Sequence, residues 1–272
     1  MPRFLRDPET GLLVPRRRGD VEVPARLVHP QMFACATGVF DNKAQLVSDP
    51  YWGSVALLCH MNGANNSTLA VDSTSYARTI NCSSGTGGAS TISTAQKKFG
   101  TASFALASGT SGGGATYSGN PSASLSFGTG DFTLEGWLYL PSTTATFPAL
   151  YQTDGGHTGR FYFGKYPGAN QLYVQAPSGS DIGPFTADFV ATTWTHVAWS
   201  RISGVSQIYV DGTRKYNAAD TNNYQAGTTG FYLGAQLGTL GADFLDDLRI
   251  TVGVGRYTGA TITVPTAEFP NY

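Results

Sequence analysis

The sequence predicts an all-β protein built from two antiparallel sheets, and three observations lead to this prediction. Several segments alternate apolar and polar residues with a period of two, as half-buried strands do. Turn-forming pairs such as Asn62-Gly63 and Asp211-Gly212 follow these segments. Glycine is abundant, at 34 residues, and only 13% of residues are charged, which suits many short strands joined by tight turns. No segment has the pattern of a long helix.

The first 53 residues are predicted to form an extended N-terminal arm with a hinge, because their composition differs from that of the rest of the chain. They hold six of the twelve arginines and six of the fourteen prolines, spaced too closely for a normal helix or strand. Segments 12–14 and 21–23 can each add as a strand to the sheet edge of another chain. This interpretation as a docking arm competes with that of a disordered tail or an irregular cap on the same domain. The residues expected to dock are Phe4, Leu5, Leu12, Leu13, Arg16, Arg17, Arg18, Val21 and Val23.

The chain from residue 54 onward is predicted to be a continuous series of strands, with a loop at 83–94. In 132–140, one row of side chains is apolar, and the opposite row contains Thr133, Glu135, Trp137 and Tyr139. Because both rows are rich in apolar or aromatic residues, this strand is expected in the centre of a sheet. The other predicted strands are 55–61, 102–106, 115–117, 150–152, 161–163, 171–175, 194–201, 206–210, 231–234 and 244–251.

Four strings of residues resemble a known family, and they occur in that family's order. They are SVALLCHMNG at 54–63, GTGDFTLEGWLYLP at 128–141, WTHVAWSRISGVSQIYVDGT at 194–213 and DDLRITVGVGRYTG at 246–259. Together they resemble the laminin-G-like jelly roll of the concanavalin A-like lectin/glucanase superfamily, most closely the module found in tailed-phage virion proteins. The resemblance implies one jelly-roll sandwich over residues 54–272, preceded by the arm at 1–53.

The residues predict that the protein is not an enzyme, although this superfamily includes glycoside hydrolases. Those enzymes carry acidic residues two and four positions apart on one strand, so that both project from the same face. Here Glu135 is followed at these positions by Trp137 and Tyr139, and Asp246-Asp247 are adjacent and expected on opposite faces. Neither His60 nor His196 has a catalytic motif around it, so both are interpreted as structural.

Calcium is the one metal that the resemblance makes plausible, since laminin-G-like domains often bind it with aspartate and carbonyl oxygens. The family's first strand ends in His-Phe-Asp-Gly, whereas this chain has His60-Met61-Asn62-Gly63. The resemblance places Asp246 beside Asn62, so any calcium is expected to bind weakly at these two residues. The alternative, which we favour, is that Asp246 caps backbone N–H groups. No other cofactor is expected.

A host glycan is a further candidate ligand. Exposed aromatic rings with polar neighbours form carbohydrate platforms, and Tyr151, Tyr162 and Tyr166 lie in an aromatic cluster with a Gly-rich loop between them. The alternative interpretation, which we favour, is that these rings pack in the core or against a neighbouring subunit, because large sandwiches bury many aromatic residues.

The net charge and the hydropathy of the sequence limit the classes of partner that we expect. The net charge of −1 argues against nucleic acid as the main partner. The sequence has no apolar run long enough to span a membrane, and the N-terminus lacks the apolar region of a secretion signal. Cys35, Cys59 and Cys82 have no metal-binding spacing, so free thiols in a protein made in the host cytoplasm are expected.

From the resemblance we expect a non-enzymatic structural protein of a tailed-phage virion. The first interpretation is a capsid decoration or cement protein, docked through its arm on major capsid or tail subunits and assembled as a homo-oligomer. The alternative is a tail-associated carbohydrate-binding module that adheres to the host.

Overall fold

The computed structural model describes two short strands near the N-terminus and most of the chain from residue 48 onward. The described ranges are 4–6, 13–15, 48–82, 84–85, 88–107, 109–111, 114–119, 122–143, 148–153, 162–166, 169–177, 180–225, 230–234, 237–240 and 242–272. The chain divides into two compact units, Met1–Val47 and Ser48–Tyr272.

In the first unit, β1 (Phe4–Arg6) pairs with β2 (Leu13–Pro15) in an antiparallel hairpin. Segment 12–14, which was predicted to add to the sheet of another chain, overlaps β2 and so has a partner strand in its own chain. The predicted docking residues Leu12, Arg16, Arg17, Arg18, Val21 and Val23 lie outside the described residues.

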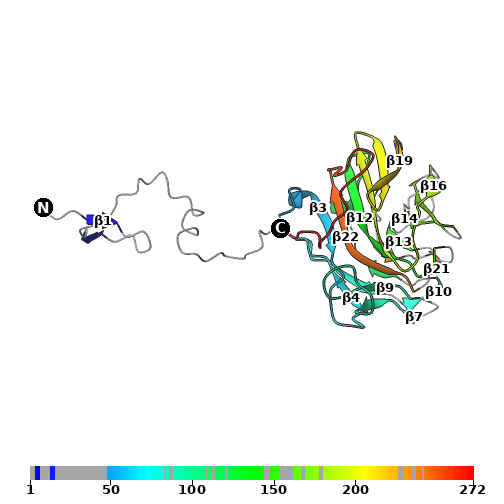
Figure 1. Ribbon diagram of the computed structural model, residues 1–272, viewed down its shortest axis with the longest axis horizontal. Helices are drawn as coiled ribbons and strands as arrows, with labels where there is room; N and C mark the ends of the chain where they lie inside the picture. Colours follow the sequence, from blue (N-terminus) through cyan, green and yellow to red (C-terminus); the bar gives the residue numbers. More distant parts are fainter. Residues whose placement is uncertain are drawn as a thin grey trace. The chain divides into compact units, whose positions relative to one another are not determined.

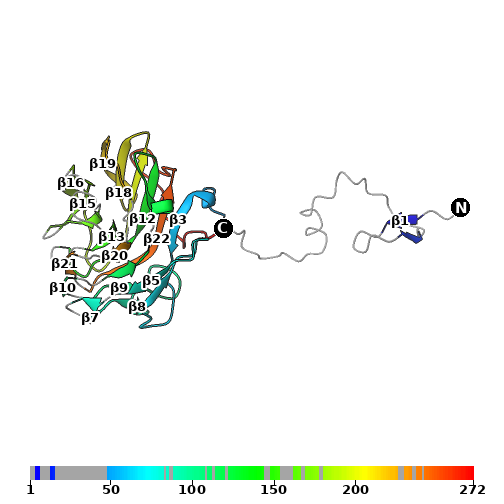
Figure 2. The same ribbon diagram turned by 180° about the vertical axis from the view of Figure 1, so that it is seen from behind.

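Two eight-stranded antiparallel sheets form the second unit (Figures 1 and 2). The first sheet has the order β19-β18-β17-β12-β22-β9-β8, and β3 also pairs with β22. Its strands are β3 (Val55–Cys59), β8 (Thr91–Ser93), β9 (Ser103–Ala105), β12 (Phe132–Tyr139), β17 (Trp194–Ile202), β18 (Val205–Val210), β19 (Thr213–Ala219) and β22 (Phe244–Val252).

The second sheet has the order β16-β15-β14-β13-β20-β11-β5-β4. Its strands are β4 (Leu69–Val71), β5 (Thr79–Cys82), β11 (Ala115–Tyr117), β13 (Ala149–Thr153), β14 (Tyr162–Lys165), β15 (Gln171–Gln175), β16 (Ile182–Thr186) and β20 (Phe231–Gly234). The remaining elements are β6 (Ser84–Gly85) paired with β7 (Gly88–Ala89), β10 (Gly109–Ser111) paired with β21 (Leu237–Leu240), η1 (Trp52–Ser54) and α2 (Ser122–Leu125). The predicted all-β jelly-roll sandwich is confirmed.

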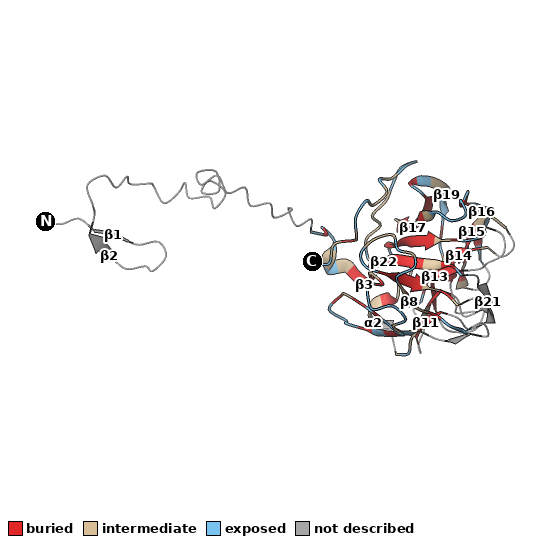
Figure 3. Cartoon of the chain, turned by 60° about the horizontal axis from the view of Figure 1, so that its bottom comes forward, coloured by how far each residue is buried: buried red, intermediate tan, exposed pale blue. Residues whose placement is uncertain are grey.

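Strand β12 lies in the centre of the first sheet, as its two apolar rows predict. It pairs with β17 on one side and β22 on the other, and Figure 3 shows how thoroughly the central strands of the sandwich are buried. Phe132, Leu134 and Leu138 belong to the core between the sheets. Asp211 and Gly212 join β18 to β19 with φ values of 43° and 79°, the left-handed conformation that a tight hairpin of this type needs.

The C-terminal segment 253–272 runs across the outer face of the first sheet, the face directed away from the second sheet. Its contacts begin at β12, where the backbone N–H of Arg256 donates to Thr133 Oγ1 at 2.8 Å. They continue to the far edge, where Thr213 and Thr261 form an isolated antiparallel bridge. The C-terminal segment therefore covers part of the outer face of this sheet.

No helix in the described part of the chain is long and apolar enough to cross a membrane. Cys59 and Cys82 are both free thiols, as the sequence predicts, whereas Cys35 lies outside the described residues.

Candidate functional site

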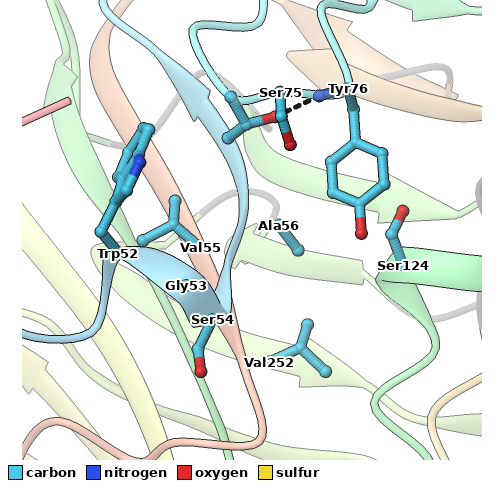
Figure 4. A pocket seen from close by; sticks show the side chains of 10 residues that line it. Trp52, Gly53, Ser54, Val55, Ala56, Ser75, Tyr76, Ser124 and Val252 are labelled. Atoms are coloured by element: carbon cyan, nitrogen blue, oxygen red, sulfur yellow. Dashed lines mark hydrogen bonds between the residues drawn. The ribbon is translucent and has the colours of Figure 1, made fainter. Parts of the chain in front are cut away.

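A pocket of about 360 Å³ opens at one end of the second unit, where segments from both sheets meet. Figure 4 shows Trp52 and Tyr76 on opposite sides of it, with Val55, Ala56 and Val252 between them. Ligand pockets in proteins commonly range from 300 to 1,000 Å³, so this one has room for a small ligand. Its lining residues are Trp52, Gly53, Ser54, Val55, Ala56, Thr74, Ser75, Tyr76, Ser124 and Val252.

One wall of the pocket is the turn that precedes β3. The backbone N–H of Trp52 donates to the carbonyl of Asp49 at 3.1 Å, and that of Ser54 donates to the carbonyl of Tyr51 at 2.8 Å. These two bonds close the short helix η1, and β3 continues directly from it. The turn therefore holds Trp52 at the edge of a strand that is itself buried in the first sheet.

The opposite wall is the β4–β5 hairpin, which Asp72 ties to β3. The Asp72 carboxylate accepts from the backbone N–H of Leu58 at 3.2 Å and from that of Thr74 at 3.0 Å. The backbone N–H of Ser73 donates to the carbonyl of Leu58 at 2.7 Å. Since Thr74 and its neighbours are anchored in this way, the hairpin presents Tyr76 with 52% of its surface exposed.

Arg78 stands behind Tyr76, and its charge is neutralised inside the protein. Its Nη1 donates to Asp72 Oδ2 at 2.6 Å and to the carbonyl of Ala56 at 2.7 Å, and its guanidinium lies 4.3 Å from the centre of the Tyr76 ring. One face of that ring is therefore occupied. None of the described residues that line the pocket is acidic or basic. The pocket thus offers aromatic and small apolar surfaces with hydroxyl groups from Ser54, Ser75 and Ser124, a lining suited to a neutral polar ligand.

Glu135, the acidic residue of β12, belongs to a closed ion network on the outer face of the first sheet. Its Oε1 accepts from Arg249 Nε and Nη2 at 3.0 and 2.7 Å, and its Oε2 accepts from the Tyr257 hydroxyl at 2.6 Å. His196 Nε2 lies 3.3 Å from Oε2. Burial opposes ionisation of this fully buried carboxyl, but Arg249, His196 and Tyr257 outweigh it and lower the pKa of Glu135 to about 2. A permanently charged, inaccessible carboxylate cannot act as a general acid at neutral pH.

The expectation that Asp246 and Asp247 point to opposite faces is wrong, because a bulge interrupts β22. Asp246 lies opposite Trp137 on the outer face, and the register between β12 and β22 shifts at the next residue, where Asp247 has a φ of 45°. Asp247 also reaches the outer side, where Oδ1 contacts His60 Nδ1 at 2.7 Å and Oδ2 accepts from the backbone N–H of Phe269 at 2.8 Å. His60 is thus hydrogen-bonded to a buried carboxylate, as the structural interpretation expects.

Both residues of the predicted calcium site have protein partners. Asp246 Oδ2 accepts from the backbone N–H groups of 98–99 at 2.7 and 3.1 Å, as in the alternative interpretation. Burial raises the pKa of Asp246 to about 7 despite these bonds. Asn62 Oδ1 accepts from the backbone N–H of Thr101 at 2.6 Å, and Nδ2 donates to Glu268 at 2.7 Å. Within the described ranges, no three His, Cys, Asp or Glu side chains are grouped as a metal site would require. The weak calcium site stays a prediction.

The glycan-platform interpretation, which the sequence disfavoured, is wrong for two of its three tyrosines. Tyr151 is completely buried in the core between the sheets, and Tyr162 is 2% exposed in a small cluster with Ala149 and Tyr173. Tyr166 is half-buried and packs against this cluster. Since two of the rings are inaccessible, the three tyrosines cannot form one exposed surface, and for Tyr151 the alternative of core packing is correct.

Sequence reasoning missed the pocket. Its walls come from 52–56, 74–76, 124 and 252, which are distant in the chain, and none of these segments has a binding motif. The only indications in the sequence are two aromatic residues, Trp52 and Tyr76, beside serine-rich turns.

Comparisons with known proteins agree with the fold. A family model described as the concanavalin A-like lectin/glucanases superfamily matches residues 108–251. Among solved structures, the binding domain of botulinum neurotoxin DC in complex with rat synaptotagmin II is similar, with a TM-score of 0.54 and 13% identity. It covers 74% of this chain and 48% of the other, and the same domain in complex with SialylT has a TM-score of 0.53 and 14% identity over the same shares.

The botulinum neurotoxin serotype D binding domain has a TM-score of 0.51 and 12% identity, covering 81% of this chain and 49% of that one. This chain thus spans about half the length of these structures, and at such identities the similarity shows the fold alone. No curated protein matches the chain in sequence.

Proposed function

Since the chain belongs to the concanavalin A-like lectin/glucanase superfamily, we propose that it is a non-enzymatic carbohydrate-binding module of a tailed-phage virion, and that the Trp52–Tyr76 pocket holds the sugar. The observation that carries this proposal is the composition of the pocket: aromatic rings on opposite walls, small apolar residues between them, and hydroxyl groups, with no charged side chain among the described lining residues. A sugar ring has apolar C–H faces and a rim of hydroxyl groups, so it matches such a lining.

A neutral sugar fits better than an acidic one. Arg78, the cation behind Tyr76, is 6% exposed. Its Nη1 already donates to Asp72 and to the carbonyl of Ala56, and its Nη2 donates to the Ser124 hydroxyl of the pocket lining. A carboxylate in the pocket would lose its hydration without gaining an ion pair. The proposed ligand class is therefore a neutral hexose unit at the end or side of a surface polysaccharide.

The state of the carboxylates supports a binding role rather than hydrolysis. Glu135 is fully buried in ion pairs, and Asp246 and Asp247 accept hydrogen bonds from backbone N–H groups on the covered side of the same sheet. Retaining and inverting glycosidases both need two accessible carboxyl groups on either side of the scissile bond. Glu135 instead forms a buried structural ion pair with Arg249.

The virion location is part of the proposal and comes from the resemblance of the four sequence strings to phage modules. Capsid decoration is the second candidate function, and the separate unit Met1–Val47 with its β1–β2 hairpin favours it. The two candidates differ in what the first unit does. If it is the docking device, a protein lacking residues 1–26 will fold but will not join the particle, whereas glycan retention will be unchanged.

Retention on host surface polysaccharide, measured with purified full-length protein, tests the glycan proposal. Tyr76→Ala and Trp52→Ala should each weaken binding by roughly tenfold, which corresponds to about 1.4 kcal/mol. Val190→Ala is the control, because Val190 is an exposed apolar residue, at 62%, and does not line the pocket. Equal retention of all four proteins would refute the assignment of the pocket.

A further inference from the structure

A buried carboxylate, that of Asp49, joins the wall of the pocket that carries Trp52 to the first sheet. Its Oδ2 accepts from Arg249 Nη1 and from Arg256 Nη2, both at 2.8 Å, and its Oδ1 accepts from Arg256 Nη1 at 2.9 Å. Oδ1 also accepts from the backbone N–H of Tyr51 at 2.8 Å. The Asp49 side chain is fully buried, so water cannot replace these partners.

The backbone of Asp49 is held as well. Its N–H donates to the carbonyl of Tyr272 at 2.9 Å, and its carbonyl accepts from the N–H of Trp52, the bond that begins η1. Asp49 therefore contacts the pocket wall through both its side chain and its main chain. It is also the second residue of the sandwich unit, directly after Met1–Val47.

The two arginines are fixed independently of Asp49. Arg249 donates to Glu135, and Arg256 Nε donates to Thr251 Oγ1 at 2.7 Å. Glu135 and Thr251 lie in β12 and β22, which pair with each other in the first sheet. The arginine clamp is thus part of the rigid sheet. Besides Asp49, the turn is held by the packing of Trp52 against Val55, Leu58 and Phe269 and by its continuation into β3.

We propose that Asp49 is the positioning residue of the Trp52–Tyr76 pocket. Clamped by Arg249 and Arg256, it holds the Tyr51–Ser54 turn against the first sheet. The sugar-binding part of this inference rests on the proposed function, whereas the control of the pocket wall does not. Hydrogen bonds and the charges of both arginines also keep the pKa of Asp49 low in spite of its burial, so the clamp is charged at neutral pH.

Hydrogen exchange of the full-length Asp49→Asn variant tests the control of the pocket wall without any sugar. The amides of Trp52, Ser54 and Val55 should exchange at least tenfold faster, because the turn opens locally, while those of β12 keep their protection. Acrylamide quenching of Trp52, isolated by comparison with Trp52→Phe, should increase in parallel. Asp188→Asn is the matched control, since it breaks the exposed ion pair with Lys215 and should change neither signal.

Two results would overturn the inference: unchanged exchange at 52–55, or equally accelerated exchange throughout the sandwich, which would make Asp49 a general stabilising residue. If Asp49→Asn does not fold, Arg256→Gln serves instead, because it leaves the Asp49–Arg249 ion pair intact. This variant should give a smaller increase in exchange at the same amides, and no increase there would also refute the proposal.

Retention on polysaccharide tests the sugar-binding part of the inference separately from hydrogen exchange. Asp49→Asn should weaken retention on polysaccharide about tenfold, and retention that matches the unsubstituted protein despite an opened turn would refute the positioning role. If the unsubstituted protein retains no polysaccharide while exchange at 52–55 still depends on Asp49, the proposed function fails and the control of the pocket wall stands.

Discussion

Replacing Glu135 with glutamine removes the charge at the centre of the buried ion network and keeps the size of the side chain. Glu135 is fully buried, with Arg249 donating two hydrogen bonds to Oε1 and Tyr257 donating one to Oε2. Removing one partner of a buried ion pair costs about 3–5 kcal/mol, because the remaining charge stays buried without compensation. Arg249 keeps Asp49 as a second partner, so the lower end of this range is expected.

The pKa of Glu135 supplies a second estimate. Burial raises it, but Arg249, His196 and Tyr257 together lower it from the ordinary value of 4.5 to about 2. At about 1.4 kcal/mol per pKa unit, this difference corresponds to roughly 3 kcal/mol. Because the pKa is depressed in the folded state, the stabilisation is fully present above pH 4.5 and is lost as the pH falls through 2.

Urea denaturation at pH 7 and at pH 3 measures both consequences. We expect Glu135→Gln to lower the free energy of unfolding by about 3 kcal/mol at pH 7, and by less than half of that at pH 3. Glu268→Gln is the matched control, since Glu268 is half-buried and its Oε1 accepts from Asn62, a contact that glutamine can preserve. A loss below about 1 kcal/mol at pH 7, or an equal loss at both pH values, would refute the reasoning.

Three further predictions concern residues outside the pocket. Tyr151→Ala should lower the free energy of unfolding by about 3–5 kcal/mol without changing glycan retention, because the ring is in the core; loss of retention by a stable variant would contradict this. Burial lowers the pKa of His60, but Asp247 outweighs it and raises the pKa above 6.5, so the pair stabilises below pH 6.5 and this contribution is lost as the pH rises. His60→Asn should therefore destabilise more at pH 5.5 than at pH 9, and the opposite order would contradict the pairing. Chelation should barely change the melting temperature, because Asp246 already accepts backbone N–H groups; a large drop would show a structural metal.

The sequence alone predicted the features that depend on neighbouring residues. The two apolar rows of 132–140 correctly indicated a central strand, because side-chain alternation is a property of one strand whatever its partners. Asp211-Gly212 correctly indicated a tight turn, because its positive φ values depend on those two residues. Composition and position also favoured core packing for Tyr151 and backbone capping for Asp246, and the structure shows both.

Tertiary structure decided which distant residues meet. The register between β12 and β22 shifts at Asp247, so the Asp247 side chain lies on the same side as that of Asp246 instead of alternating with it. No pattern in the sequence near Asp247 predicts this shift. The pocket depends on the approach of 52–56 to 74–76, and Asp49 depends on arginines 200 residues or more away in the chain. Strand propensity and turn chemistry act over a few residues, whereas pockets and buried ion pairs arise only from sheet pairing and packing, which local patterns leave open.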